Sequence, residues 1–223
     1  MTGRASAGDL VAQTRSELAD IAESIRSHRF IELLRTRDVP RERLAAFAKT
    51  QHMIVSSDRR SFAVLAARFP GGLAGEFFLG MAEGEGLALH KLNGLRDWLG
   101  ITDAELRAHE PHPGTQAYPA FVAWLALNGP RADVVLAFLS NLAVWGDNCG
   151  AVAAALRDAY GADDAAVAFF DFFANPPAGF EARALAVLDE GLAGGDSPAS
   201  ARSASRVLQA YELSFWDALA EWL

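Results

Sequence analysis

Apolar residues recur at steps of three and four positions along almost the whole chain, and no segment shows sustained two-residue alternation with β-branched residues. Steps of three and four place side chains on one face of an α-helix, whereas a half-buried strand needs a period of two. Alanine, leucine, glutamate and arginine, which favour helices, dominate the same stretches. The pattern therefore predicts an all-α protein.

Proline and glycine mark the ends of these helices, because proline suits the first turn of a helix and glycine its C-terminal cap. Neither a linker nor a repeat interrupts the series, so we expect one domain over residues 1–223, built from eight to ten helices. The expected ranges are residues 8–27, a short helix after His28–Arg29–Phe30, then 40–69, 76–100, 102–107, 118–127, 130–160, 163–174, 179–192 and 198 to the end, with a loop at 109–115.

The helix expected at residues 76–100 is unusually rich in glycine, with Gly80, Gly84, Gly86 and Gly94. A glycine inside a helix costs about 1 kcal/mol relative to alanine, so we expect either close backbone packing or room for a ligand. Glu83 and His90 share one face of this helix. They lie roughly 10 Å apart along its axis, and both could point into one cavity. The alternative is that Glu83 and Glu85 are solvated and that His90 is a core histidine with a satisfied ring.

The composition supports a sizeable core, with 223 residues, 51% of them hydrophobic, and a mean hydropathy of +0.10. No apolar run reaches about 18 residues and the start of the chain lacks an apolar signal core, so we expect no membrane span. The only cysteine, Cys149, excludes an intrachain disulfide and favours a cytoplasmic location. A net charge of −8 argues against direct contact with nucleic acid, which needs clustered lysine and arginine.

Several polar side chains fall on otherwise apolar helix faces. Glu212 shares a face with Leu208 and Phe215, so loss of hydration should raise its pKa. Such a carboxyl can donate a proton near neutral pH; the alternative is that Glu212 pairs with an arginine at the helix rim. Polar groups in an apolar, aromatic interior are typical of a small-molecule site. The other candidates for that site are His52, Glu83, His90, Tyr118, Asn141, Asp147 and Phe173.

Five short segments follow one another in a characteristic order: His28–Arg29–Phe30, Lys49–Thr50–Gln51–His52, the acidic stretch before Leu89–His90, the segment around Tyr118, and residues 210–216. In this order they resemble the TenA family (thiaminase type II-like proteins) of the heme-oxygenase-like fold, over about residues 15–222. The most specific element is the last, Tyr-Glu-x-x-Phe-Trp. The resemblance implies a heme-oxygenase-like helical bundle.

Enzymes of the TenA family hydrolyse thiamin or aminopyrimidine breakdown products with a cysteine nucleophile, an aspartate, a glutamate that moves protons, and tyrosines that line the pyrimidine site. The resemblance assigns proton transfer to Glu212 and pyrimidine binding to Tyr118. It places His52 at the aspartate position, Leu142 at the cysteine position, and Val55, Gly146 and Phe173 at tyrosine positions. Cys149 lies roughly 10 Å beyond Leu142 along the helix and fits an apolar core position better than that of a nucleophile.

Three functions follow as hypotheses. The first is a divergent TenA-like hydrolase that binds or hydrolyses a thiamin-related aminopyrimidine or another small aromatic compound, without a cofactor. Its candidate catalytic residues are Glu212 and His52, and its candidate substrate-binding residues are Tyr118, Phe173, Asn141 and Asp147. The second is a non-heme iron (di-iron) oxidase of the same fold. The third is a non-catalytic ligand-binding or regulatory homologue, in keeping with the family's association with transcriptional activation.

The oxidase hypothesis rests on the seven-residue spacing of Glu83 and His90, which is similar to one ligand helix of the iron enzymes of this fold. Asp147 would supply a carboxylate from another helix. The last helix contains no histidine, although iron sites of this kind combine imidazole and carboxylate ligands.

Apolar residues also cluster at the C-terminus, where we expect an apolar surface formed by Trp216, Leu219, Trp222 and Leu223. Relatives of this fold are commonly dimers or tetramers. We therefore expect a homo-dimer or homo-tetramer that binds a small molecule.

Overall fold

The computed structural model describes residues 6–221, and every regular element in that range is an α-helix. The all-α prediction is therefore confirmed. The eleven helices are α1 (Ala7–Glu17), α2 (Ala19–Arg26), α3 (Arg29–Arg35), α4 (Arg41–Arg68), α5 (Gly72–Leu99), α6 (Asp103–Arg107), α7 (Pro113–Asn128), α8 (Arg131–Tyr160), α9 (Asp164–Ala174), α10 (Phe180–Ala193) and α11 (Pro198–Ala220).

The single helix expected at residues 8–27 is two helices, α1 and α2, and this split explains why the described residues form eleven helices rather than eight to ten. The chain leaves helical geometry at Leu18, where φ is −99° and ψ is 6°. Leu18 is buried. Both α1 and α2 contact α8 and α11, and α1 also packs against α10, so the bend directs α1 towards that helix.

The loop expected at residues 109–115 is shorter than the sequence indicated, because α7 begins at Pro113. The His112 Nδ1 atom accepts a hydrogen bond of 3.1 Å from the backbone N–H of Gly114. This bond satisfies one of the free N–H groups of the first turn. Histidine is not among the usual capping residues, so the pattern gave no signal for this start.

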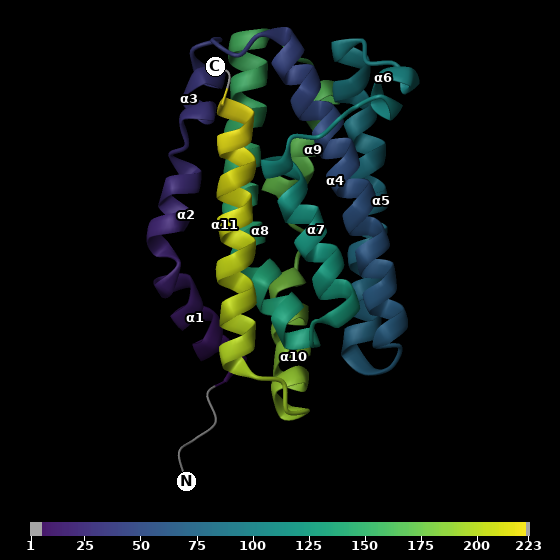
Figure 1. Cartoon of the computed structure of the whole chain (residues 1–223), viewed down its shortest axis with the longest axis vertical. Helices are drawn as coiled ribbons and strands as arrows, with labels where there is room; N and C mark the ends of the chain where they lie inside the picture. The colour runs from purple at the N-terminus through teal and green to yellow at the C-terminus, as the bar shows by residue number, and fades with distance from the viewer. Residues whose placement is uncertain (1–5, 222–223) are drawn as a thin grey trace.

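Long helices run along the length of the molecule (Figure 1). α4 packs against α5, α8 packs against α11, and α7 contacts both α4 and α11. α9 fits between α5 and α8. α1, α2 and α3 lie along the edge of the bundle beside α11, and α10 covers one end (Figure 1). The centre of the bundle is therefore bordered by six helices: α4, α5, α7, α8, α9 and α11.

The buried apolar side chains form two clusters within the described residues. One contains Phe47, Phe170 and Trp216, and the other contains Phe62 and Phe138. Tyr118 packs against both clusters. A polar group at the boundary between the two clusters leaves the apolar packing within each cluster intact.

The glycines of α5 have both of the expected roles, at different positions. A Cβ atom added at Gly94 would lie 1.9 Å from the Ala165 carbonyl oxygen of α9, so only glycine permits this close helix contact. Cβ atoms added at Gly80 or Gly84 would have no neighbour within 4 Å. These two glycines leave open space beside the helix.

α8 is the one described helix that is long and apolar enough to cross a membrane, with a mean hydropathy of 1.2 over 18 residues, but 61% of that window is buried inside the protein. The helix contacts α3, α9, α10 and α11. Its apolar character is therefore explained by its position in the core.

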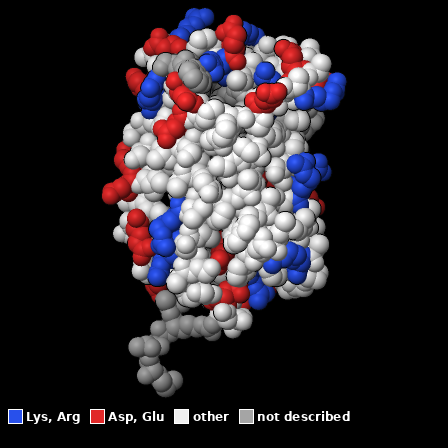
Figure 2. Space-filling model, viewed as in Figure 1, with Lys and Arg blue, Asp and Glu red and all other residues white. Residues whose placement is uncertain are grey.

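The apolar surface expected at the C-terminus is wrong for Trp216, which is fully buried. Leu219 is only partly exposed and packs against the core. Trp222 and Leu223 lie outside the described residues. Large exposed apolar side chains occur instead at Trp124 and Leu127 on α7, at Leu73, Leu79 and Leu87 on α5, and at Val64 on α4. The face over α7 and α11 carries few charged side chains in its middle, whereas charges gather near its ends and sides (Figure 2).

Candidate functional site

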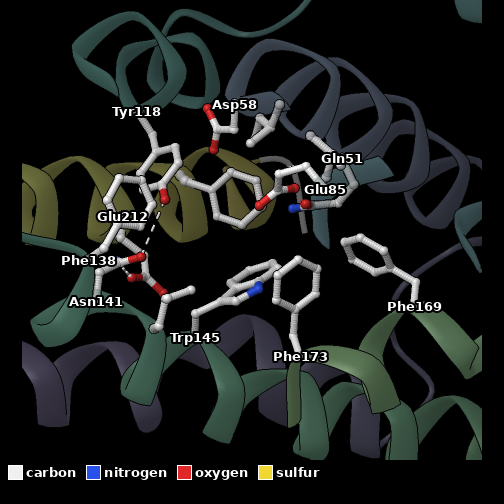
Figure 3. A pocket seen from close by; sticks show the side chains of 14 residues that line it. Gln51, Asp58, Glu85, Tyr118, Phe138, Asn141, Trp145, Phe169, Phe173 and Glu212 are labelled. Carbon is white, nitrogen blue, oxygen red and sulfur yellow. Dashed lines mark hydrogen bonds between the residues drawn. The ribbon is translucent and has the colours of Figure 1, made fainter. Parts of the chain in front are cut away.

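A cavity lies at the junction of the six central helices, and Figure 3 shows the side chains that line it. The free space between them is about 50 Å³, which is enough for a few water molecules. Most of the wall is apolar, and aromatic rings dominate it: Phe138, Trp145, Phe169, Phe173 and Phe215. The polar lining residues are Gln51, Asp58, Glu85, Tyr118, Asn141 and Glu212. An aromatic cavity that contains three carboxyl groups is the main chemical feature of the molecule.

Glu212 on α11 is held by hydrogen bonds from two neighbouring side chains. The Asn141 amide nitrogen donates to Glu212 Oε2, and the Trp216 indole N–H donates to Oε1 at 3.3 Å. The Tyr118 hydroxyl donates to Asn141 Oδ1 at 3.3 Å. Glu212 is only 3% exposed. The carboxyl group is thus fixed in position at the wall of the cavity (Figure 3).

Burial raises the pKa of Glu212 to about 8, although the hydrogen bonds from Trp216 and Asn141 act in the opposite direction. Loss of hydration disfavours the charged carboxylate, so the group is mostly protonated at pH 7. The alternative expectation, an arginine partner at the rim, is not met within residues 6–221: Glu212 forms no ion pair there, and Arg26 pairs with Asp147 instead. Glu212 has the environment of a proton donor.

Asp58 on α4 and Glu85 on α5 form a second acidic group in the same cavity. Asp58 was not among the residues expected there from the sequence, and the expectation of a solvated Glu85 is wrong. Burial raises the pKa of Asp58 to about 8. Burial also raises the pKa of Glu85 well above its usual range, and the nearby charge of Asp58 raises it further. Two carboxyls that disfavour each other's charge hold a proton near neutral pH. Asp58 Oδ1 is buried and has no hydrogen-bond partner among the described residues, so it is available to accept a hydrogen bond from a ligand.

The signal for both residues was present in the helix period. Asp58 follows Gln51 and Val55 at steps of four and three, and both of those residues are buried. Glu85 lies seven residues after Phe78 and seven before Leu92, which are both buried. In each case a carboxylate occupies a position at which the period predicts an apolar residue.

The expectation that Glu83 and His90 point into a common cavity is wrong. Both side chains are exposed on α5, and Leu87 between them is 57% exposed, so this face of the helix is directed to solvent. Among residues 6–221, no group of three or more histidine, cysteine, aspartate or glutamate side chains is arranged to hold a metal ion. The geometry on which the iron hypothesis depended is therefore not found.

Two further candidates lie away from the cavity. His52 does not line it, although its neighbour Gln51 does. Burial lowers the pKa of His52, and the charge of Arg96 lowers it further while Asp103 opposes this, so the ring faces the ends of α5 and α6. Asp147 is exposed and forms an ion pair of 2.8 Å with Arg26. His52 lies outside the cavity because its neighbour Gln51 faces inward, and Asp147 lies two residues beyond the lining residue Trp145.

The remaining candidates do line the cavity. Asn141, Tyr118 and Phe173 contribute to its wall together with Glu212. Burial raises the pKa of the Tyr118 phenol, and the charges of Asp58, Glu212 and Glu85 raise it further. All three carboxyls therefore act on the same hydroxyl group, which stays protonated and can donate a hydrogen bond.

The positions at which the resemblance implied a cysteine and tyrosines carry apolar groups that border the same space. Leu142 and Val55 line the cavity, and a side chain at Gly146 would meet the Phe173 carbonyl oxygen at 2.9 Å. Cys149 is buried in the core and does not line the cavity. Burial raises the pKa of its thiol well above the usual range, so the reactive thiolate is disfavoured.

Comparison with solved structures supports the fold. A TenA homologue from Pseudomonas syringae pv. tomato superposes with a TM-score of 0.82 at 12% sequence identity, covering 99% of this chain and 98% of that chain. A TenA homologue from P. horikoshii gives a TM-score of 0.73 at 19% identity, with 95% and 98% covered. A domain of unknown function with a heme oxygenase-like fold from Shewanella denitrificans gives a TM-score of 0.72 at 14% identity, with 94% and 90% covered.

At these identities the structural likeness shows the fold alone, which is the heme-oxygenase-like bundle expected from the sequence. No curated protein sequence matches the chain. A family model described as TENA/THI-4/PQQC matches residues 15–221. Because this match spans nearly the whole length, the chain belongs to the TENA/THI-4/PQQC family.

Proposed function

We propose that the central cavity binds the polar edge of a small heteroaromatic amine of the aminopyrimidine type, and that Glu212 transfers a proton in its hydrolysis. The observation that carries this proposal is a buried Glu212, held by Asn141 and Trp216, in an aromatic cavity that also contains Asp58 and Glu85. Membership of the TENA/THI-4/PQQC family supports the choice of substrate class.

The lining suits both parts of such a ligand. An aminopyrimidine presents an amino N–H donor beside a ring nitrogen acceptor, and a protonated carboxyl group offers one donor and one acceptor in return. The unpartnered Asp58 Oδ1 would accept a hydrogen bond from the amino group. The rings of Trp145 and Phe173 would contact the flat heterocycle.

The chemistry proposed here needs no thiol. Water would attack the methylene carbon that carries the leaving amine of an aminomethyl-pyrimidine, the carbon–nitrogen bond would break, and the new carbon–oxygen bond would give the hydroxymethyl product. Protonated Glu212 would give its proton to the departing amine. The proton lost by water would pass to the Asp58–Glu85 pair, which would accept it in the state in which its two carboxyl groups share a single proton. Leu142 at the expected cysteine position is then compatible with activity.

The test compares the wild-type protein with Glu212→Gln, which keeps the size and polarity of the side chain but cannot transfer the proton. Trp145 fluorescence would follow binding of an aminomethyl-pyrimidine and of thiamin, and the hydroxymethyl product would be quantified by chromatography. We expect wild-type hydrolysis to fall about 100-fold or more in Glu212→Gln, with ligand affinity largely kept. Glu83→Gln, a change at an exposed carboxylate outside the cavity, is the matched control and should retain the wild-type rate.

Equal hydrolysis by wild type and Glu212→Gln would contradict the role of Glu212. Binding without any hydrolysis by the wild-type protein would favour the second candidate, a non-catalytic ligand-binding protein. The observation in favour of that candidate is Leu142, an inert side chain at the wall where the family's nucleophile is expected. Failure to bind either compound would contradict the proposed substrate class.

A further inference from the structure

A second and larger hollow adjoins the cavity. It has a volume of about 890 Å³ and lies between α5, α8, the end of α9 and the start of α10. Glu85, Phe138, Leu142 and Phe173 line both spaces. Because these side chains belong to both linings, the two spaces lie side by side, with the buried carboxyl groups at the inner one; we refer to the larger space as the outer channel.

Two glycines of α5 leave the outer channel open. Gly80 and Gly84 lie one turn apart and both line it. Cβ atoms added at these positions would meet no atom within 4 Å, so close packing does not explain them. Glycine weakens a helix relative to alanine, so these two residues lower the stability of α5. A ligand that occupies the space beside them would explain why glycine is present.

The outer channel and the inner cavity differ in chemistry. Apolar side chains, including Phe77, Met81, Leu139 and Phe180, make up much of the channel wall. Apart from Glu85, its charged lining residues are Arg15, Arg183, Glu76 and Glu181, which balance in number, and Arg15 pairs with Glu181 at 2.9 Å. The buried acidic groups are concentrated at the inner end.

We propose that the ligand of this protein is amphipathic, with a small basic or hydrogen-bond-donating aromatic head in the inner cavity and a linear apolar tail in the outer channel. The head group rests on the function proposed above, whereas the tail rests on the channel. The inner space of about 50 Å³ admits only a small group, and the outer space of about 890 Å³ is far larger than a bare heterocycle needs. Three carboxyl groups at the inner end disfavour an anionic head such as a fatty acid carboxylate.

The test uses two homologous series: 4-aminopyrimidines with linear alkyl chains of one to ten carbons, and n-alkylamines of the same lengths. Burying one methylene group contributes about 0.8 kcal/mol, so Kd should fall about fourfold per added carbon until the channel is filled. The quantity compared between variants is the Kd of the shortest chain divided by the Kd of the longest chain, a ratio in which general losses of affinity cancel.

In Gly84→Leu and, separately, Gly80→Leu, the new side chain occupies the channel, and we expect the Kd ratio to fall at least tenfold. Leucine favours a helix more than glycine does, and a Cβ atom at either site meets no atom within 4 Å. Helical content and thermal unfolding confirm that each variant folds. Glu83→Leu places the same side chain on the exposed face, next to Gly84, and should leave the ratio unchanged.

A wild-type Kd that does not depend on chain length would overturn the proposal, as would the same dependence in both glycine variants. The two proposals fail separately. If alkylamines show the chain-length dependence and aminopyrimidines do not bind, the channel is supported in its apolar role but the head group, and with it the proposed amphipathic ligand, is wrong. If aminopyrimidines bind without chain-length dependence, the tail is wrong and the function proposed above is unaffected.

Discussion

At the scale of single residues, the protein concentrates its unusual chemistry in three carboxyl groups that share one aromatic cavity. Glu212 has its hydrogen-bond partners in place, whereas Asp58 has a buried oxygen atom without one. A buried acceptor without a partner costs about 1–3 kcal/mol, so such an atom is expected where a ligand supplies the missing donor. This difference suits Glu212 to proton transfer from a fixed position and Asp58 to binding a ligand.

The raised pKa of Glu212 predicts how stability depends on pH. The folded state holds a proton on Glu212 up to about pH 8, whereas the unfolded chain releases it near the ordinary value of about 4.3. The folded state therefore binds more protons between these values, and the free energy of unfolding falls as pH rises across that window. We expect Glu212→Gln to reduce this fall, by an amount on the order of a few kcal/mol.

Urea unfolding at several pH values between 4.5 and 8.5 measures this dependence directly. The Asp58–Glu85 pair contributes a fall of the same sign, so some dependence should remain in the Glu212→Gln variant. Glu83→Gln serves as the reference, because Glu83 is exposed. Identical pH profiles for wild type and Glu212→Gln would show that Glu212 ionises normally in the folded state.

At the scale of elements, α5 shows how one helix can serve both packing and binding. Its N-terminal half borders the outer channel through Gly80 and Gly84, and its C-terminal half approaches α9 closely through Gly94. Glu85, between these parts, lines the inner cavity. Within this one helix, some glycines therefore leave open space and another permits a close helix contact.

A matched pair of substitutions tests this division. Gly94→Ala forces a methyl group into the Ala165 carbonyl and should destabilise the protein by about 1–3 kcal/mol. Gly80→Ala adds the same group in open space and should stabilise the helix by about 0.5–1 kcal/mol. Chemical denaturation gives both values, and changes of the same sign and size at the two positions would contradict the assignment.

Helix periodicity and breakers were sufficient to predict most elements, because α8, α9 and α10 begin and end at proline, glycine or capping residues. They could not predict the break at Leu18, which depends on which neighbours α1 and α2 pack against. The same limit applies to the site. Periodicity identified Glu212, but the choice between Glu83 and Glu85, or between His52 and Gln51, depends on a helix rotation that only the packed bundle fixes.

At the scale of the whole molecule, six helices must assemble before the cavity exists, so binding and folding are linked. The surface adds a second feature, since the face over α7 and α11 carries few charges in its middle (Figure 2). Trp124 and Leu127 on α7 are 54% and 66% exposed. Exposed apolar patches of this kind mark interaction surfaces. The homo-oligomer expected from the sequence stays a prediction, and this face is our candidate for its interface.

Sedimentation velocity tests that prediction. We expect the wild-type protein to sediment as a dimer or tetramer, and Trp124→Glu together with Leu127→Glu to shift it towards the monomer, because a buried unpaired charge disfavours the interface. Leu87→Glu changes an exposed leucine on α5 and is the control. A monomeric wild-type protein, or a double variant that keeps its oligomeric state, would refute the assignment.

The most direct test of the central claim is a crystal structure of the protein with a saturating aminopyrimidine. We expect density for one heterocycle in the central cavity, with its amino nitrogen within hydrogen-bond distance of Asp58 Oδ1 and its ring against Trp145 and Phe173. The leaving-group side should face Glu212. A ligand bound elsewhere, for example at the exposed Glu83 and His90, would contradict binding in the central cavity, as would an empty cavity at saturation.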